Sequence, residues 1–306
     1  MRVAVLGLGR MGAPIAERLQ RAGHELSVWN RSPAASAPFA DAGAAVLRRP
    51  ADAWQHADVA ITMLADDDAV TAVTLGAGGE HDEVGDGALL AGDLAPGRTV
   101  IDMSTISPAA SAQVAEAAER HGTGYLRAPV SGNPSVVVAG NLGIIVSGDP
   151  DTYARCRPLL ADIGPNLFYL GRAEQARVAK LALNLMIGGT TQLLAEAIVL
   201  CQRAGIDRGE LLEVVAGSAI GSPYVSYKSR ALADGDYSST FTARLLHKDL
   251  SLALEAAHTA AVPLPVTALV QQLTQSCIAQ GWGELDLAVL LPALERAAGE
   301  EPHFRA

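Results

Sequence analysis

The chain contains few cysteines and no recognisable metal-binding motif. Its three cysteines, Cys156, Cys201 and Cys277, lie far apart and form no CxxC pair. This number and spacing argue against a disulfide framework and against a zinc site built from thiolates. The seven histidines are also scattered, and no HExxH sequence occurs. We therefore expect no metal cofactor.

Basic residues are in short supply as well. The 306 residues include 23 Lys and Arg against 33 Asp and Glu, which gives a formal net charge of −10. Non-specific nucleic-acid binding needs a surplus of cations to neutralise phosphates, so this charge argues against a nucleic-acid partner. A small anionic ligand remains compatible with it, because a local cluster of donors can outweigh the overall field.

Sequence features of export and of membrane insertion are absent. Met1 leads directly into an apolar run at residues 2–6, without the basic segment and long apolar stretch of a signal peptide. No uncharged apolar run of about 18 residues or more occurs, so we expect no membrane span. With 49% hydrophobic and 18% charged residues, the composition is that of a globular protein. We expect a cytoplasmic location.

In the first half of the chain, short runs of Val, Ile and Leu alternate with Ala-rich segments of helical spacing. The expected strands are 2–6, 25–29, 59–64, 99–103, 124–130 and 143–146, and the expected helices include 12–21, 108–120 and 151–161. This alternation predicts a mainly parallel, doubly wound α/β sheet. Residues 76–97, rich in Gly, Asp and Glu, are expected to form an exposed, mobile excursion.

After about Gly171 the composition becomes helical. Residues 173–204 contain no proline and would form a helix of roughly 45 Å, at about 1.5 Å per residue. Further helices are expected at 207–216, 242–260 and 265–280. We predict an α/β domain at 1–172 and an all-α domain at 173–306, joined by the long helix. Because so apolar a helix needs partners on several faces, we also expect a homodimer.

A GxGxxG sequence lies between the first expected strand and the first expected helix. In Gly7–Leu8–Gly9–Arg10–Met11–Gly12, Gly7 would permit a tight turn and Gly9 a close approach of backbone to a pyrophosphate. Gly12 would let helix and strand pack closely, and the helix N-terminus would face the phosphates. A plain glycine turn is the alternative, but the strand–loop–helix context favours dinucleotide binding.

The end of the second expected strand indicates which dinucleotide is bound. NAD sites usually place Asp or Glu here, where it accepts hydrogen bonds from the ribose 2′-hydroxyl. This chain instead reads Asn30–Arg31–Ser32. A guanidinium and a hydroxyl suit a 2′-phosphate, because Arg forms charge-assisted hydrogen bonds with phosphate oxygens. We therefore predict NADPH, against the alternative of an ordinary solvated Arg.

Two polar segments follow later strands. Ser104–Thr105 ends the expected strand 99–103, at the edge where a doubly wound sheet binds ligands, and could contact the nicotinamide or the substrate. Helix capping by Ser or Thr is the stronger reading of this pair when it is taken alone. Ser131, Gly132 and Asn133 offer a hydroxyl, N–H groups and an amide that suit a substrate carboxylate, although the same residues favour a β-turn.

Lys180 and Asn184 lie four residues apart in the long helix and so share one of its faces. All other residues from Val178 to Ile187 are apolar. A Lys in such surroundings either extends its ammonium to water or is desolvated. Desolvation would lower its pKa and make it a usable proton donor. Asn184 could then orient a substrate hydroxyl.

With these motifs in place, the whole chain resembles the β-hydroxyacid dehydrogenase family, which includes 3-hydroxyisobutyrate, tartronate semialdehyde and glyoxylate/succinic semialdehyde reductases. The resemblance rests on matching motifs in family order and at family spacing. These are the Gly7–Gly12 loop with Met11, Met63–Leu64–Ala65–Asp66, Ser104–Thr105, Pro129–Val130–Ser131–Gly132, Lys180 with Asn184, and Phe241 followed by Lys248–Asp249.

The resemblance implies a Rossmann domain, an all-α domain and an active site between them. It implies that Lys180 is the general acid for carbonyl reduction, that Asn184 positions the substrate, and that Ser131 and Gly132 hold its acid end. Phe241 and Lys248 would close over the cofactor. The full set of cofactor-binding residues that we expect is Gly7, Gly9, Arg10, Met11, Gly12, Asn30, Arg31, Ser32, Met63, Leu64, Thr105, Phe241 and Lys248.

Two residues depart from the family pattern, which usually reads Asp-Ala-Pro-Val-Ser-Gly-Gly. Here Arg127 replaces the acid and Asn133 replaces the second glycine. Asn133 is expected to narrow the approach to the substrate carboxylate. The related imine reductases share this fold, prefer NADPH and generally lack the catalytic Lys. A small-carbonyl reductase is therefore the leading hypothesis, an imine or iminium reductase the second, and a catalytically silent dinucleotide-binding protein the third.

Overall fold

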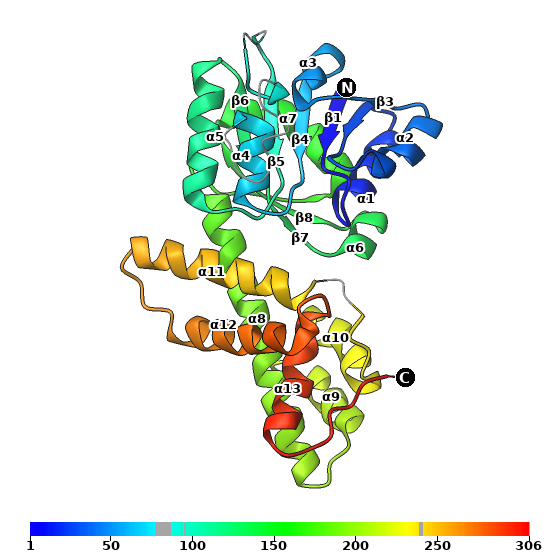
Figure 1. Ribbon diagram of the computed structural model, residues 1–306, viewed down its shortest axis with the longest axis vertical. Helices are drawn as coiled ribbons and strands as arrows, with labels where there is room; N and C mark the ends of the chain where they lie inside the picture. Colours follow the sequence, from blue (N-terminus) through cyan, green and yellow to red (C-terminus); the bar gives the residue numbers. More distant parts are fainter. Residues whose placement is uncertain (77–86, 93, 95, 239–240, 306) are drawn as a thin grey trace. The chain divides into compact units, whose positions relative to one another are not determined.

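The computed structural model describes the whole chain except residues 77–86, 93, 95, 239, 240 and 306. The chain divides into two compact units, Met1–Lys180 and Leu181–Ala306. The first unit is an α/β structure and the second is helical (Figure 1).

A nine-stranded sheet forms the centre of the first unit, with strands in the order β3-β2-β1-β4-β5-β6-β8-β7 and with β9 paired to β8. The pairs from β3 to β6 are parallel, whereas β8 runs antiparallel to β6 and β7. The order 3-2-1-4-5-6 is that of a doubly wound dinucleotide-binding sheet. The expected fold class is confirmed. The strands are β1 Arg2–Leu6, β2 Glu25–Trp29, β3 Ala45–Val46, β4 Val59–Thr62, β5 Thr99–Asp102, β6 Gly124–Arg127, β7 Val130–Ser131, β8 Gly143–Gly148 and β9 Asn166–Tyr169.

Helices cover both faces of this sheet, so its strands are buried on both sides. In β1, Val3 and Val5 pack into one core with Ile15 of α1 (Gly12–Arg21), while Ala4 and Leu6 pack into the other. The first core also receives α7 (Pro150–Ile163), and the second receives α3 (Ala53–His56), α4 (Asp67–Leu75) and α5 (Pro108–Arg120). Two-sided burial explains why these strands are continuous apolar runs instead of alternating patterns.

Two local expectations for this unit need correction. The expected strand 124–130 is two strands, β6 and β7, separated by Pro129, which has no N–H to give to a ladder. Much of the expected excursion at 76–97 lies outside the described residues. Within it, however, Leu89 and Leu90 are buried, and Leu89 accepts a hydrogen bond from the Trp54 indole. This part of the segment is core, not an exposed excursion.

The second unit packs helices around a single apolar core. The long helix α8 (Gln175–Arg203) begins in the first unit and continues into the second, close to the expected span. It is followed by α9 (Arg208–Gly217), α10 (Pro223–Asp234), α11 (Ala243–Thr259), α12 (Pro265–Cys277) and α13 (Leu290–Ala297). Asp207 caps α9 in a capping box with Glu210. Neither α10 nor α13 was expected.

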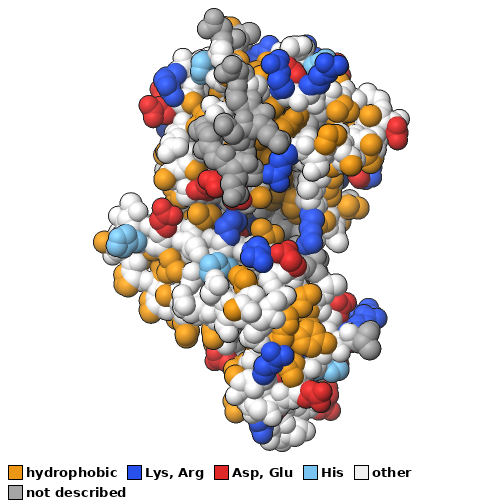
Figure 2. Space-filling model, viewed as in Figure 1, with side chains coloured by type: hydrophobic (Ala, Val, Ile, Leu, Met, Phe, Trp, Pro, Cys, Tyr) orange, Lys and Arg blue, Asp and Glu red, His pale blue; other side chains and the backbone are white. Residues whose placement is uncertain are grey.

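Helix α8 keeps apolar side chains on its surface. Met186, Leu193 and Leu200 are 63%, 65% and 73% exposed, and hydrophobic side chains are visible on the surface of the helical unit (Figure 2). By length and composition alone, α8 could also cross a membrane, although 44% of its most apolar stretch is buried in this structure. Core helices of soluble proteins share that length and composition.

Candidate functional site

The three glycines of the loop between β1 and α1 differ in how much space the fold leaves for a side chain. Gly7 has a φ of +100°, and a Cβ there would lie 2.3 Å from the carbonyl oxygen of Met63. A Cβ on Gly12 would lie 1.9 Å from the carbonyl oxygen of Gly7. A Cβ on Gly9, in contrast, would meet no described atom within 4 Å. The fold therefore requires Gly7 and Gly12, whereas Gly9 leaves its backbone open to a ligand.

The start of α1 suits a phosphate. Its N-cap, Met11, provides no side-chain acceptor for the N–H groups of the first turn. Helix N-termini without such an acceptor attract anions through these N–H groups and through the helix dipole. Arg10 is exposed and Met11 half-buried in this loop. The open backbone at Gly9 and the uncapped helix fit the pyrophosphate of a dinucleotide.

Asn30 connects the loop to the turn after β2. Its Oδ1 accepts a hydrogen bond from the N–H of Leu8 at 2.9 Å, and its Nδ2 donates to the carbonyl of Ser32 at 3.0 Å. The amide of Asn30 thus holds the loop and the turn together. Arg31 and Ser32 follow on the surface, at the end of β2 where the sequence predicts the 2′-phosphate.

A buried ion pair lies beneath the carboxyl ends of β4 and β5. The guanidinium of Arg177, in the first turns of α8, donates to Asp102 Oδ2, to the Ser104 carbonyl at 2.6 Å and to Ser111 Oγ at 3.2 Å. Thr62 Oγ1 and Ser104 Oγ donate to Asp102 Oδ1 at 2.7 and 2.6 Å. The carboxylate and the guanidinium are 0% and 1% exposed, so the network is shielded from water.

The charge on Arg177 is strongly favoured in this network. Burial opposes the charged form, but the attraction of Asp102, together with Tyr125, outweighs it and raises the pKa of Arg177. Burial likewise raises the pKa of the Tyr125 hydroxyl, whose oxygen accepts a hydrogen bond from Arg177 at 3.1 Å. The start of α8 is therefore fixed to the end of β5 by charge and by hydrogen bonds. Lys180, half-buried, follows Arg177 by about one turn of this helix.

Ser104 has a different role from the capping expected for it. Its Oγ accepts a hydrogen bond from the N–H of Leu64 at 2.9 Å while donating to Asp102. The cap of α5 is Ser107, whose Oγ accepts from the N–H of Ala110 at 3.0 Å. Leu64 and Met63 are half-buried at the end of β4, and Thr105 is half-buried after β5.

The segment that is expected to hold the substrate acid begins at the end of β7, which contains Ser131. Gly132 has a φ of +143°, and a Cβ there would approach Leu142 Cδ1 to 2.9 Å, so glycine is required. Asn133 caps α6 (Pro134–Val138), because its Oδ1 accepts a hydrogen bond from the N–H of Val136 at 3.1 Å. The side chain of Asn133 is thus turned towards the helix that follows it.

Arg127, the other departure from the family pattern, is also locally paired. Its Nε donates to Glu174 Oε1 at 2.7 Å, and its guanidinium lies 4.8 Å from the ring centroid of Tyr125. Arg127 is 7% exposed. Both contacts balance its charge inside the α/β unit.

In the helical unit, three polar residues from α8 and α11 come together. Asn184 is 2% exposed, and its Nδ2 donates to Asp249 Oδ2 at 2.5 Å. Lys248 Nζ lies 3.0 Å from Asp249 Oδ1. Asn184 Oδ1 is buried without a hydrogen-bond partner among the described residues. A buried, unpaired amide oxygen is costly unless something donates to it, so it fits a substrate hydroxyl. Phe241 is half-buried just before α11.

Sequence reasoning did not select Asp102, Arg177 or Asp249 as site residues. Weak signals were available for two of them. Asp102 is a carboxylate at the end of a buried strand, and Arg177 is a second cation on the same apolar helix as Lys180. Their partnership spans 75 residues of sequence and depends on the fold.

Comparison with known proteins covers nearly the whole chain. Residues 2–171 match the family model described as the NAD binding domain of 6-phosphogluconate dehydrogenase. Residues 175–294 match the one described as the NAD-binding of NADP-dependent 3-hydroxyisobutyrate dehydrogenase. The NAD-dependent L-serine dehydrogenase of Pseudomonas aeruginosa is 34% identical over 98% of this chain and 99% of its own length.

Solved structures are also similar to this chain over nearly its whole length. The 3-hydroxyisobutyrate dehydrogenase of Mycobacterium tuberculosis with L-serine has a TM-score of 0.83 and 30% identity, over 96% of this chain and 99% of that one. An imine reductase from Pseudomonas sp. has a TM-score of 0.59 and 23% identity, over 95% of this chain and 98% of that one. The second similarity concerns the fold alone.

The different reasons for Gly9 and Gly12 can be tested with two alanine variants. Because a Cβ on Gly9 meets no described atom within 4 Å, Gly9→Ala should change the free energy of unfolding by no more than about 0.5 kcal/mol. It should weaken the binding of NADP⁺ by about tenfold or more, or 1.4 kcal/mol. Gly12→Ala should lower the free energy of unfolding by roughly 2 kcal/mol, because its Cβ collides with a carbonyl.

Urea denaturation measures the stability of both variants, and calorimetric titration with NADP⁺ measures binding. If Gly9→Ala binds NADP⁺ as tightly as the unmodified protein, this loop is not the pyrophosphate site. If Gly12→Ala is as stable as the unmodified protein, the close packing of loop and helix has no energetic importance.

Proposed function

Since this chain belongs to the β-hydroxyacid dehydrogenase family of oxidoreductases, we propose that it uses NADPH to reduce small carbonyl compounds, converting a semialdehyde or keto acid to the hydroxyacid. The proposal depends on the position of helix α8 and on the side chains that it carries. Its start is anchored to the carboxyl end of β5 through Arg177 and Asp102, and it carries Lys180 and then the buried, unpaired amide oxygen of Asn184 one turn further on.

The cofactor is assigned from the residues around the first two strands. The Gly7–Gly12 loop would hold the pyrophosphate, and Arg31 with Ser32 would hold the 2′-phosphate. No carboxylate follows β2 to accept a ribose 2′-hydroxyl. The matched family description names an NADP-dependent enzyme, whereas the Pseudomonas aeruginosa relative is NAD-dependent, so relatives differ in this respect. When bound, NADPH supplies a hydride to the carbonyl carbon.

Lys180 would donate a proton to the carbonyl oxygen, which becomes negative as the carbon accepts the hydride. A positioned general acid is typically worth about 10²–10⁴-fold in rate. Asn184 Oδ1 would accept a hydrogen bond from the resulting hydroxyl, and Asp249 fixes the amide of Asn184 through its Nδ2. The amide therefore has one orientation available, with its oxygen left for the substrate.

The substrate would be a short β-hydroxy acid or its oxidised form. L-serine and 3-hydroxyisobutyrate, after which the relatives described above are named or with which one was solved, both carry a hydroxyl β to a carboxylate. Ser131 and the backbone at Gly132 and Asn133 would hold the carboxylate. The Asn133 side chain caps α6. The backbone N–H groups of Gly132 and Asn133 are therefore the donors that this turn offers to a carboxylate.

The cofactor assignment predicts the effect of Arg31→Ala. Loss of this guanidinium should raise the KM for NADPH by about tenfold or more, because charge-assisted contacts to phosphate are worth roughly 1.5–3 kcal/mol. The KM for NADH should hardly change. Steady-state kinetics with both cofactors measures the difference. An unmodified protein that uses NADH more efficiently than NADPH would contradict the assignment.

The role of Lys180 predicts that Lys180→Ala reduces kcat on aldehydes or keto acids by about 10²–10⁴-fold, with little change in NADPH affinity. Val178→Ala is the matched control, because Val178 lies on the same helix and is 52% exposed. Imine substrates separate the two enzyme hypotheses, since an iminium already carries its proton. Full activity of Lys180→Ala on carbonyls rules out this mechanism, and activity that survives only on imines favours an imine reductase.

We also propose that the protein is a homodimer that covers the exposed face of α8. Met186, Leu193 and Leu200 recur at seven-residue intervals, so they lie along one side of the helix. Such a stripe on a soluble protein marks an interaction surface. Light scattering at micromolar concentration should give the mass of a dimer.

Leu193→Glu should shift the mass towards the monomer, because it places a charge in the covered stripe. Val214→Glu is the matched control, since Val214 on α9 is similarly exposed, at 68%, but lies outside the stripe. A monomeric unmodified protein, or equal effects of both variants, would contradict the proposed interface.

A further inference from the structure

The strand register places Arg48 beside the end of β2. Strands β2 and β3 are parallel, with Ser27 opposite Ala45 and Val28 opposite Val46. The N–H of Leu47 continues this ladder by donating to the carbonyl of Val28 at 2.9 Å. Continuing the same register pairs Asn30 with Arg48. Neighbouring strands lie about 4.8 Å apart, so Arg48 reaches the turn that contains Arg31 and Ser32.

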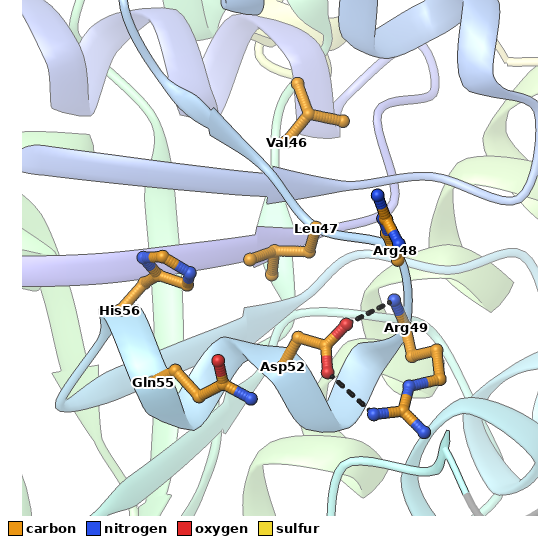
Figure 3. Close-up of a pocket in the computed structure, with 7 residues that line it drawn as sticks. All are labelled: Val46, Leu47, Arg48, Arg49, Asp52, Gln55 and His56. Carbon is orange, nitrogen blue, oxygen red and sulfur yellow. Dashed lines mark hydrogen bonds and ion pairs between the residues drawn. The ribbon is translucent and has the colours of Figure 1, made fainter.

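Alternation along the strand decides which way Arg48 points. Leu47 is buried in the core on the α3 side of the sheet, whereas Val28 is buried in the core on the opposite side. Side chains two residues apart share a face, so Arg48 lies on the face of Val46, and Asn30 lies on that of Val28. Figure 3 shows Arg48 and Val46 projecting to the same side, away from Asp52 and Gln55. Arg48 and Asn30 therefore share one face of the sheet.

The neighbouring Arg49 is paired with Asp52. Its guanidinium lies 3.1 Å from Asp52 Oδ1, and its N–H donates to Asp52 Oδ2 at 3.0 Å (Figure 3). Arg48 is exposed and has no hydrogen bond or ion pair with any residue in the described part of the chain. It borders a surface groove of about 460 Å³, and its exposed side chain has room to reorient. One of these two adjacent cations is thus available to a ligand.

We propose that Arg48 is a second cationic ligand of the NADPH 2′-phosphate, acting together with Arg31. The inference rests on the proposed use of NADPH. A 2′-phosphate carries more negative charge and more acceptor oxygens than one guanidinium can satisfy. A second guanidinium from the adjacent strand end supplies further charge-assisted hydrogen bonds. Arg48 is then a determinant of cofactor specificity, not a catalytic residue.

The test uses two fragments of the cofactor that differ at the relevant position, 2′,5′-ADP and 5′-AMP. Calorimetric titration of the full chain measures both affinities without any turnover. In Arg48→Ala, the affinity for 2′,5′-ADP should fall by about five- to tenfold, and that for 5′-AMP should be unchanged. Arg21→Ala is the matched control, because Arg21 is 67% exposed and pairs with Glu17 at the far end of α1. It should bind both fragments normally.

Each other outcome identifies what is wrong. If the unmodified protein prefers 2′,5′-ADP and only Arg31→Ala removes that preference, NADPH use stands and the role of Arg48 is overturned. If Arg48→Ala weakens both fragments equally, Arg48 acts on the adenosine or on the local fold, and the proposal also fails. If the unmodified protein shows no preference for 2′,5′-ADP, the use of NADPH itself is wrong.

Discussion

The arrangement of the α/β unit depends on the buried ion pair between Arg177 and Asp102. Burying either charge alone would cost several kcal/mol, whereas here the carboxylate and the guanidinium neutralise each other and find further hydrogen-bond partners. Well-packed apolar residues could contribute as much stability in the same space. Apolar residues, however, would not fix the orientation of α8. The planar guanidinium, bonded to Asp102, Ser104 and Ser111, fixes both the position and the rotation of the first turns of α8, and thereby the place at which Lys180 emerges.

This ion pair is one end of a series of contacts that leads to the glycine loop. Asp102 holds Ser104, and Ser104 Oγ accepts from the N–H of Leu64. The adjacent carbonyl of Met63 lies so close to Gly7 that no side chain fits there. The ends of β1, β4 and β5 are thus held to one another, and α8 is held to them. A dinucleotide in the loop and a proton donor on α8 would then be positioned by the same set of contacts, which is the preorganisation that hydride transfer needs.

The sequence predicted those features whose cause is local. Buried parallel strands appear as apolar runs, and the bounds of β1 and β2 agree with the expectation because Gly, Asn and charged residues end them. Pro129 explains the division between β6 and β7, although its effect was not anticipated. Leu89 and Leu90 are buried in the same core as Trp54, which lies far away in sequence and donates to the carbonyl of Leu89. In the same way, residue type alone could not show that Asn30 would bind the N–H of Leu8, because this contact exists only when β1 and β2 are adjacent. The NADPH preference, the catalytic residues and the dimer stay predictions.

The departure at Arg127 illustrates why a motif has to be interpreted together with its surroundings. By sequence, replacing the usual acid with Arg so near to Ser131 places a strong cation beside the expected carboxylate site. In the structure, Glu174 supplies the compensating charge and Tyr125 the stacking surface, and both lie in the same α/β unit. The cation is thus neutralised where it stands and has no need of an anionic ligand. Gly132 keeps its positive φ, and the side chain of Asn133 caps α6. The substitutions at Arg127 and Asn133 therefore change the side chains around the turn, but the backbone N–H groups of the turn remain in place as donors. The acid-binding role of the turn is therefore compatible with both substitutions.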